Sequence, residues 1–495
     1  MDNRRRWVLG GLAISLACFI IFKIGYPYPD FFSDSYSYLF AADADLNTNI
    51  WPIGYSKFLS LVHLFSASDT VLVAIQYFFL QGAALYFFFT VVGFYPLGRW
   101  AKLIFWLFIV VNPLSLYLCN TVNSDALFTA LTLVWLSLLI RLLHRPGWWL
   151  AILHALLLFL CFTVRNNAYY YPIVAVLPFW LCRRSPWFKL SGIVLPLVLL
   201  VLFVQWTRNE TFRITGTRQY SLFTGWQLAN NALYIYDRIS VDSTLFVTPE
   251  AREVNRMMIG YLGRQNLPVY RERVEESVGN YFIRAPDAPL KQYYSMHADP
   301  SDRRRFSVIR HWARCSAAFE PFGKPILLHY PLAYGRYFVG PNLWRYFLPP
   351  LSHIGLYNYG QAHIEPIAQR WFGYHEPQVW VVSYTLQGGL YSYALLFFVL
   401  NVTYVFLAVA FLLQWRKGGV DRESIALFRL MSAYLLFNGL FSLAATVNIL
   451  RYQVAPMYIL LLGSLWLGLR LNASGAAKAE ARKPEERQGV FAPQQ

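Results

Sequence analysis

Asp34 is an acidic residue that stands a few positions after the first apolar run of the chain, within the segment 31–38 (Phe-Phe-Ser-Asp-Ser-Tyr-Ser-Tyr). A carboxylate at the end of an apolar helix can act as a general base, because it can take the proton from the hydroxyl group of an acceptor. Ser or Asp at such a place is also typical of a helix cap, so a purely structural role for Asp34 stays open.

Two further acidic patterns could hold a divalent ion. Asp43 and Asp45 form an Asp-x-Asp string, whose carboxylates are suitable ligands, although strings of this kind are common by chance. Asp125 follows Asn123 and Ser124 and precedes an apolar run. It is a candidate ligand for Mg²⁺ or Mn²⁺, the only cofactor that we expect, and could position a phosphate-linked donor through that ion. An acid before an apolar helix is also a common helix start signal.

Two arginines stand at the ends of apolar runs. Arg165 follows the run 148–164, and Arg451 opens the last run, 453–470. A guanidinium group can bind a phosphate through two parallel hydrogen bonds, so both arginines are candidate phosphate ligands. Either side chain could instead extend to the lipid headgroups. Charged groups are costly at such boundaries, and together with Asp34 these arginines predict a site for a polar headgroup.

His329 and Arg336 lie in the aromatic segment 325–359 and are candidates for contacts to an acceptor. A single histidine among aromatic residues is more often structural than functional. The segment itself, rich in Tyr, Trp, Phe and Pro, is typical of chain that lies at a membrane–water interface.

Apolar runs of membrane-spanning length position all of these residues. The chain of 495 residues is 57% hydrophobic and only 14% charged, against about 25% charged residues in soluble domains. We therefore predict an all-α polytopic membrane protein with about ten transmembrane helices. The predicted spans are 7–25, 71–92, 102–118, 126–143, 148–164, 169–182, 190–206, 388–413, 425–445 and 453–470.

The net charge of +17 is explained by membrane orientation. Lys and Arg are frequent in alternate short loops, and Arg4, Arg5 and Arg6 precede the first run. The positive-inside bias then places both termini in the cytoplasm, and no nucleic-acid partner is expected. The five cysteines form no Cys-x-x-Cys pair, so neither a disulfide framework nor a zinc site is expected.

These runs divide the chain into four parts. Residues 1–206 form an N-terminal transmembrane module whose first outer loop contains Asp34. Residues 207–387 form a large extracytoplasmic loop or small domain. Residues 388–470 form the C-terminal transmembrane helices, and the Ala-, Glu-, Lys- and Arg-rich tail 471–495 is predicted to be disordered and cytoplasmic.

Four segments resemble the GT-C superfamily of membrane glycosyltransferases, in particular its bacterial dolichyl-phosphate-mannose-like and aminoarabinose-transferase-like branch. Segment 33–38 is similar to the acidic segment after the first helix, and 51–59 is similar to a Pro-Pro-Gly-Tyr-Pro-type stretch, with Ile53 and Ser56 in place of two prolines. Segment 124–128 is similar to the acidic start of the fourth helix, and 451–456 to the family's closing Arg-Tyr-x-x-x-Pro motif.

The resemblance implies a GT-C-like bundle that transfers a hexose or pentose from a polyprenyl-phosphate donor, with inversion. The acceptor would be a lipid, glycan or protein at the outer face of a bacterial inner membrane, with membrane lipids as further partners. Asp34 would be the base, Arg165 and Arg451 would contact the donor phosphate, and Asp125 would bind a metal or the donor.

Two other functions stay open. An O-antigen polymerase or ligase would use essential arginines of the large loop, such as those at 303–305 or Arg336. A transporter would show two related halves with broken helices at the midplane, and the sequence contains no such repeat.

Overall fold

The computed structural model describes residues 3–277, 279–418, 420–445 and 447–488. In these residues the regular elements are all helical, and the only β pairing consists of two isolated bridges, Asp30 with Thr121 and His363 with Gln378. The prediction of an all-α fold is therefore confirmed.

Eight helices in the described part of the chain are long and apolar enough to cross a bilayer. They are Arg4–Gly25, Asp69–Phe94, Arg99–Asn120, Ser124–His144, Pro186–Thr215, Leu386–Arg416, Arg422–Ala445 and Leu450–Asn472. The corresponding elements are α1 (Asn3–Gly25), α4 (Asp69–Phe94), α5 (Arg99–Val110) with α6 (Pro113–Asn120), α7 (Ser124–His144), α10 (Pro186–Thr215), α20 (Tyr391–Arg416), α21 (Arg422–Ala445) and the first part of α22 (Val454–Gln488). The chain is a multi-pass integral membrane protein.

Two of the ten predicted spans form shorter helices than the eight above. The run 148–164 forms α8 (Trp148–Val164) with 17 residues, and 169–182 contains α9 (Tyr171–Leu181) with 11 residues. A perpendicular crossing takes about 20 residues. A 3₁₀ turn, Asn166–Tyr170, precedes α9, and Pro178 lies inside it. Hydropathy alone could not show these interruptions. Eight of the predicted spans are long and apolar enough to cross a bilayer, and the other two of the predicted ten stay a prediction.

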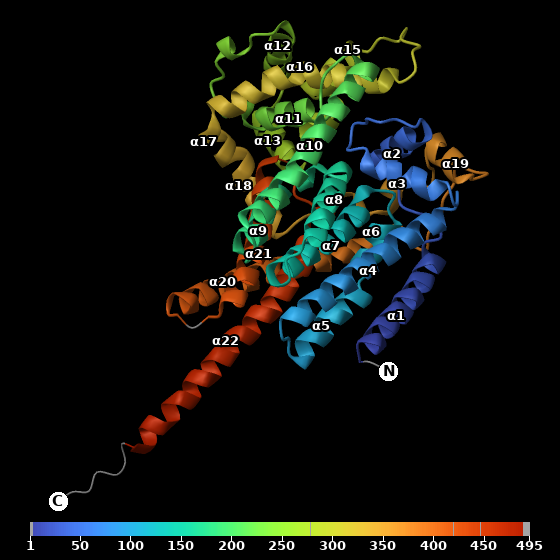
Figure 1. Ribbon diagram of the computed structural model, residues 1–495. Helices are drawn as coiled ribbons and strands as arrows, with labels where there is room; N and C mark the ends of the chain where they lie inside the picture. The colour runs from blue at the N-terminus through green and yellow to red at the C-terminus, as the bar shows by residue number, and fades with distance from the viewer. Residues whose placement is uncertain (1–2, 278, 419, 446, 489–495) are drawn as a thin grey trace, which may run out of the picture.

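A group of helices lies at one end of the bundle and forms a unit with its own core (Figure 1). Its helices are α11 (Thr224–Tyr236), α12 (Pro249–Leu262), α13 (Leu267–Glu276), α14 (Tyr281–Arg284), α15 (Pro289–Met296), α16 (Ser307–His329), α17 (Pro331–Tyr334) and α18 (Gly340–Phe347). Trp226 of α11 packs against Trp312 and Phe319 of α16 at the centre of this core. We call this group the helical cap.

The helical cap accounts for only part of the predicted 207–387 loop. Helix α10 continues nine residues past the predicted boundary at 206, to Thr215, and leads into the cap. The later part of the loop packs against the first outer segment instead, since the ring of Trp371 lies 4.2 Å from that of His63 and Tyr357 OH donates to Pro29 O at 2.9 Å. The predicted loop is therefore divided between the cap and this second group of residues.

Three shorter helices lie at the same end of the bundle as the cap (Figure 1). They are α2 (Ser33–Asp43), α3 (Gly54–His63) and α19 (Pro366–Phe372). The backbone of Asp30, just before α2, pairs with the segment before α7, since its N–H donates to Asn120 O at 2.8 Å and its carbonyl accepts from Val122 N at 3.1 Å. This pairing places the start of α2 beside the start of α7.

Part of the tail 471–495, which is predicted to be disordered, continues the last helix in the structure, and the cytoplasmic location of the tail stays a prediction. Helix α22 continues to Gln488, and residues 489–495 lie outside the described residues. The Ala, Glu, Lys and Arg that suggested disorder are also the strongest helix formers, so the last transmembrane helix extends into them.

Candidate functional site

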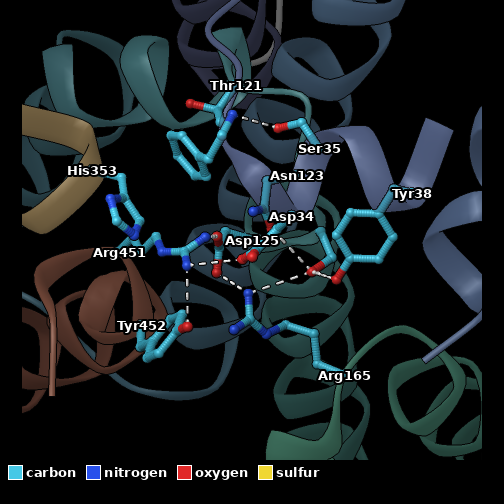
Figure 2. A network of polar contacts seen from close by, with 12 residues as sticks. Asp34, Ser35, Tyr38, Thr121, Asn123, Asp125, Arg165, His353, Arg451 and Tyr452 are labelled. Atoms are coloured by element: carbon cyan, nitrogen blue, oxygen red, sulfur yellow. Dashed lines mark hydrogen bonds and ion pairs between the residues drawn. The ribbon is translucent and has the colours of Figure 1, made fainter. Parts of the chain in front are cut away.

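Asp34, Asp125, Arg165 and Arg451 converge on one point at the cap end of the bundle (Figure 2). Asp34 lies on α2, Asp125 on the first turn of α7, Arg165 directly after α8, and Arg451 in the 3₁₀ turn Leu450–Gln453 that precedes α22. We call these four residues the charge cluster. The sequence predicted that they would gather, and the structure places them in direct contact.

Asp125 lies between the two guanidinium groups, as Figure 2 shows. Its Oδ1 accepts from Nη1 of Arg165, and its Oδ2 accepts from Nη1 of Arg451 at 2.9 Å. The Asp125 and Arg451 side chains are each only 4% exposed. Burial of an unpaired charge would be very costly, so each of these charges depends on the others to remain inside.

Asp34 makes a weaker contact with the cluster. Its Oδ2 accepts from Nη2 of Arg451 at 3.3 Å, and its side chain is 22% exposed. No hydrogen bond within the described residues occupies its Oδ1. The carboxylate is therefore held by an arginine on one side and is open on the other, as a proton acceptor must be.

Neither acid caps its helix, so the structural alternative for both is not realised. The N-cap of α2 is Phe32, whose N–H donates to Ser35 Oγ at 2.9 Å. The N-cap of α7 is Asn123, which makes no side-chain capping bond. Asp34 and Asp125 therefore remain available to bind the arginines.

Aromatic rings complete the cluster, and the sequence analysis did not single them out. The Tyr452 ring lies 4.5 Å from the Arg165 guanidinium carbon and 4.9 Å from that of Arg451, while Phe32 lies 5.0 Å from Arg451. Such contacts stabilise a desolvated cation. Tyr452 and Phe32 are sequence neighbours of cluster residues, and that position was the only signal that could have identified them.

Polar side chains next to the cluster support it. Tyr38 OH and Ser124 Oγ are 3.0 Å apart, and Ser124 Oγ donates to Asn123 Oδ1 at 3.2 Å. Arg165 Nη1 also donates to Ser124 Oγ, at 3.4 Å. Because Tyr38 lies one turn after Asp34 on α2, this network fixes α2 relative to α7.

His353 lies against Phe32 and accepts a hydrogen bond from Arg284 of the cap. Burial, together with the positive charges of Arg284 and Arg451, lowers the pKa of His353 to about 2. The imidazole is therefore neutral at physiological pH and does not compete with Arg451 for the carboxylates. No local pattern in the sequence points to His353, since its partners are about 70 and 100 residues away.

A cavity of about 390 Å³ lies between the cluster and the helical cap. Asp34, Arg165 and Tyr452 line it on the bundle side, and Gln227 and Asn231 of α11 line it on the cap side. A ligand in this cavity would touch the open side of Asp34 and one of the two arginines at once.

An apolar groove of about 910 Å³ lies beside this cavity, on the flank of the bundle. It runs between α3, α4, α7, α8 and α10, and includes Leu131, Leu160 and Leu202. Ile53 lines this groove, and its neighbours Trp51 and Pro52 line the cavity. The same short segment therefore separates a polar cavity from a lipid-like surface.

Gly54 allows that segment to approach α8. A Cβ atom at position 54 would lie 2.7 Å from the carbonyl carbon, the carbonyl oxygen and Oγ1 of Thr163, two residues before Arg165. No side chain fits in this space, so the glycine of the 51–55 motif is required by packing.

The other predicted site residues lie elsewhere. His329 and Arg336 are exposed and line neither hollow, and their contacts to an acceptor stay a prediction. Asp45 binds Lys57 at 2.7 Å, and Asp43 is exposed at the end of α2. The arginines at 303–305 are also exposed and outside both hollows, and the polymerase alternative stays a hypothesis.

The metal prediction for Asp125 stays a prediction. Among the described residues, no group of three His, Cys, Asp or Glu side chains could hold an ion. The oxygens of Asp125 accept from arginines, and Asp34 is the only other carboxylate in the cluster. In the structure Asp125 pairs with the guanidinium groups of Arg165 and Arg451.

Comparisons with known proteins returned no match from protein-family models, from curated proteins or from solved structures.

Proposed function

We propose that this protein is a membrane glycosyltransferase that moves a sugar from a polyprenyl-phosphate donor to an acceptor hydroxyl group. The observation that carries the proposal is the position of Asp34, which lines a cavity together with Arg165 and whose Oδ1 makes no hydrogen bond within the described residues. A base and a phosphate ligand at one membrane boundary are the two groups that such a reaction needs.

The apolar groove supports a donor with a long hydrocarbon tail. A polyprenyl chain lying between α4, α8 and α10 would reach the segment Trp51–Pro52–Ile53 with its phosphate end. Arg165 stands directly after α8, beyond the groove residues Thr163 and Val164, so its guanidinium lies where that phosphate would arrive.

The chemistry then requires only groups that are already in place. Asp34 Oδ1 accepts the proton of the acceptor hydroxyl, and the acceptor oxygen forms a bond to the anomeric carbon. The bond between that carbon and the phosphate oxygen breaks, and polyprenyl phosphate leaves with the bonding electrons. Arg165 stabilises the charge on the departing phosphate in a site of reduced dielectric, and attack from the opposite side inverts the anomeric centre.

The helical cap would bind the sugar or the acceptor. The polar side chains of Gln227 and Asn231 face the cavity opposite Asp34, and Trp51 provides an aromatic surface beside them. In the proposed orientation the cap and the charge cluster lie on the outer side of a bacterial inner membrane, with both termini in the cytoplasm. The acceptor would therefore be an envelope lipid, glycan or protein.

Replacement of Asp34 tests the proposal. We expect Asp34→Asn to reduce transfer from a panel of polyprenyl-phosphate-linked hexoses and pentoses by a factor of about 10²–10⁴, the usual contribution of a general base. Asp43→Asn, on the same helix but exposed and outside the cavity, is the matched control and should retain activity.

Transfer by Asp34→Asn at the rate of the unsubstituted protein would remove Asp34 as the base. Movement of a labelled solute by the reconstituted protein, with no covalent product from any donor in the panel, would support a transporter instead.

A further inference from the structure

A second cavity, of about 790 Å³, lies at the other end of the transmembrane bundle. It is formed where α4, α7 and α9 end and α21 begins. Arginines dominate its lining, with Glu423 as the acid among the lining residues. They are Arg145, Arg183, Arg184, Arg422 and Arg429. We call this hollow the arginine cavity.

The arginine cavity and the charge cluster lie on opposite sides of the membrane. Helix α7 begins beside the charge cluster with Asp125 and ends with His144, which lines the arginine cavity. Its 21 residues span about 30 Å, which is the thickness of the hydrocarbon core. The arginine cavity therefore lies on the side that the positive-inside bias assigns to the cytoplasm.

Tryptophans mark the depth of the arginine cavity in the membrane. Trp148 and Trp149, which follow the lining residues Arg145 and Pro146, are 57% and 69% exposed. Trp180 and Trp187, on either side of Arg183 and Arg184, are 73% and 77% exposed. Because tryptophan concentrates at the level of lipid headgroups, the cavity opens at that level.

The walls of the arginine cavity are fixed by hydrogen bonds. Arg184 donates to Pro146 O from Nε at 3.1 Å and from Nη2 at 2.7 Å. His144 Nε2 and Tyr95 OH are 2.8 Å apart. These bonds join the turn after α7 to the end of α9 and to the end of α4.

The positive charge of the arginine cavity is only partly compensated, by Glu423 in its lining. Among the described residues, no carboxylate forms an ion pair with any of its five arginines. With Glu423 counted, the lining carries a net charge of about +4. Membrane orientation explains arginines in short loops, but it does not require the ends of four helices to enclose a hollow between them.

We propose that the arginine cavity binds the headgroup of an anionic phospholipid, and that a lipid with two phosphates, such as cardiolipin, is preferred. Basic pockets between transmembrane helices on the cytoplasmic side suit such headgroups. The acyl chains would lie along the exposed apolar side chains of Ile173 and Leu190 on the adjoining helices α9 and α10. The proposal does not depend on the glycosyltransferase function.

Retention of lipid by a double variant tests the proposal. Arg183→Gln with Arg422→Gln removes two lining charges that make no hydrogen bond or ion pair within the described residues. We expect the unsubstituted protein, purified from bilayers of phosphatidylcholine with some cardiolipin, to retain cardiolipin in native mass spectrometry. The double variant should bind it on the order of ten-fold or more weakly, since each arginine near a lipid surface contributes about a factor of five.

The matched control is Arg99→Gln with Lys102→Gln, two charges at the start of α5 on the same side of the membrane but outside the cavity. Equal loss of cardiolipin from both double variants would overturn the proposal, because the effect would then be general surface charge. Full retention by the cavity variant would also overturn it.

Thermal unfolding separates a lipid from a soluble anion. We expect cardiolipin to raise the unfolding temperature of the unsubstituted protein more than inorganic phosphate does at the same phosphate concentration. Equal stabilisation by inorganic phosphate would assign the arginine cavity to a soluble anion and overturn the lipid proposal.

Discussion

Arg451 donates a hydrogen bond to Asp34 across 3.3 Å, although 417 positions separate the two residues in the chain. Arg451 also binds Asp125, so one guanidinium joins the candidate base, Asp34, to the candidate metal or donor ligand, Asp125. The contact unites the first and last segments of the bundle at the boundary where the proposed donor phosphate arrives.

The charge cluster is balanced, because it contains two acids and two arginines. A donor phosphate therefore adds a negative charge to a neutral site and depends on donor groups that are still available. The Nε and Nη2 groups of Arg165 have no hydrogen-bond partner within the described residues, and the side chain lines the cavity. Arg165 is consequently better placed than Arg451 to bind the phosphate.

Asp125 is expected to stabilise the folded protein as well as to form part of the charge cluster. Asp125→Asn leaves two buried guanidinium groups without their shared carboxylate, and we expect a loss of about 3–5 kcal/mol in the free energy of unfolding. Adding Arg165→Gln should recover part of the loss, which denaturant unfolding in detergent can measure as a coupling energy. Asp45→Asn, which breaks an exposed pair with Lys57, is the control and should leave the unfolding midpoint unchanged. Strictly additive losses would contradict a shared charge cluster.

A bulky substitution at Leu160 tests whether the apolar groove binds a long hydrocarbon tail. Leu160→Trp fills part of the groove, so we expect at least a ten-fold rise in KM for a long-chain polyprenyl donor, since extra bulk excludes the chain. The KM for a short-chain analogue of the donor should be unchanged. Leu156→Trp is the control, because Leu156 is also exposed on α8 but lies outside the groove. Equal effects of Leu160→Trp on long and short donors would place the tail elsewhere.

Asp30 should make the stability of the protein depend on pH. It is buried, it accepts from Asn358 N at 2.8 Å and from Gln387 Nε2 at 3.2 Å, and burial raises its pKa from 3.8 to about 7. The folded state holds the proton of Asp30 more tightly than the unfolded state does. The stabilising contribution of protonated Asp30 is therefore complete below about pH 4 and is lost as the pH rises through about 7.

Asp30→Asn should remove this pH dependence. At pH 8 we expect the variant to unfold at a higher temperature than the unsubstituted protein. The gain in the free energy of unfolding should be up to about 4 kcal/mol, because each unit of pKa shift corresponds to about 1.4 kcal/mol. The difference should vanish near pH 4, and thermal unfolding across this range measures it. Parallel pH profiles for the two proteins would show that Asp30 is ionised throughout.

Gly54 should tolerate no side chain. Gly54→Ala places a Cβ atom against the backbone of Thr163, and we expect a loss of about 1–3 kcal/mol in stability together with reduced activity, because α3 and Arg165 are displaced. Gly82→Ala on α4 is the control, since no atom lies within 4 Å of its Cβ position, and it should be neutral or slightly stabilising. A neutral Gly54→Ala would show that α3 can move without cost.

Local hydropathy and charge were sufficient to predict most transmembrane helices and all four residues of the charge cluster. A long apolar run must be helical in a bilayer, since no other open segment satisfies its own backbone there, and that rule needs no tertiary information. An acid or arginine at the end of such a run is conspicuous because desolvation makes it costly. Asp34, Asp125, Arg165 and Arg451 were recognisable for this reason.

Partners that depend on packing were not predictable. His353 and Arg284 reach the site from distant parts of the chain, and nothing in their local sequence distinguishes them from other loop residues. The exposed positions of His329 and Arg336 were not predictable for the same reason, because an aromatic segment does not show which of its faces meets the bundle.

The sequence by itself thus determined which residues stand at the membrane boundary, since that depends on apolar length alone. Only the tertiary structure decided which boundary residues touch. The rotation and tilt of each helix are set by contacts such as that of Gly54 with Thr163 and of Asp30 with Asn120, and these join segments far apart in the chain. A buried guanidinium between two carboxylates is stable only when several helices fix all three groups at once.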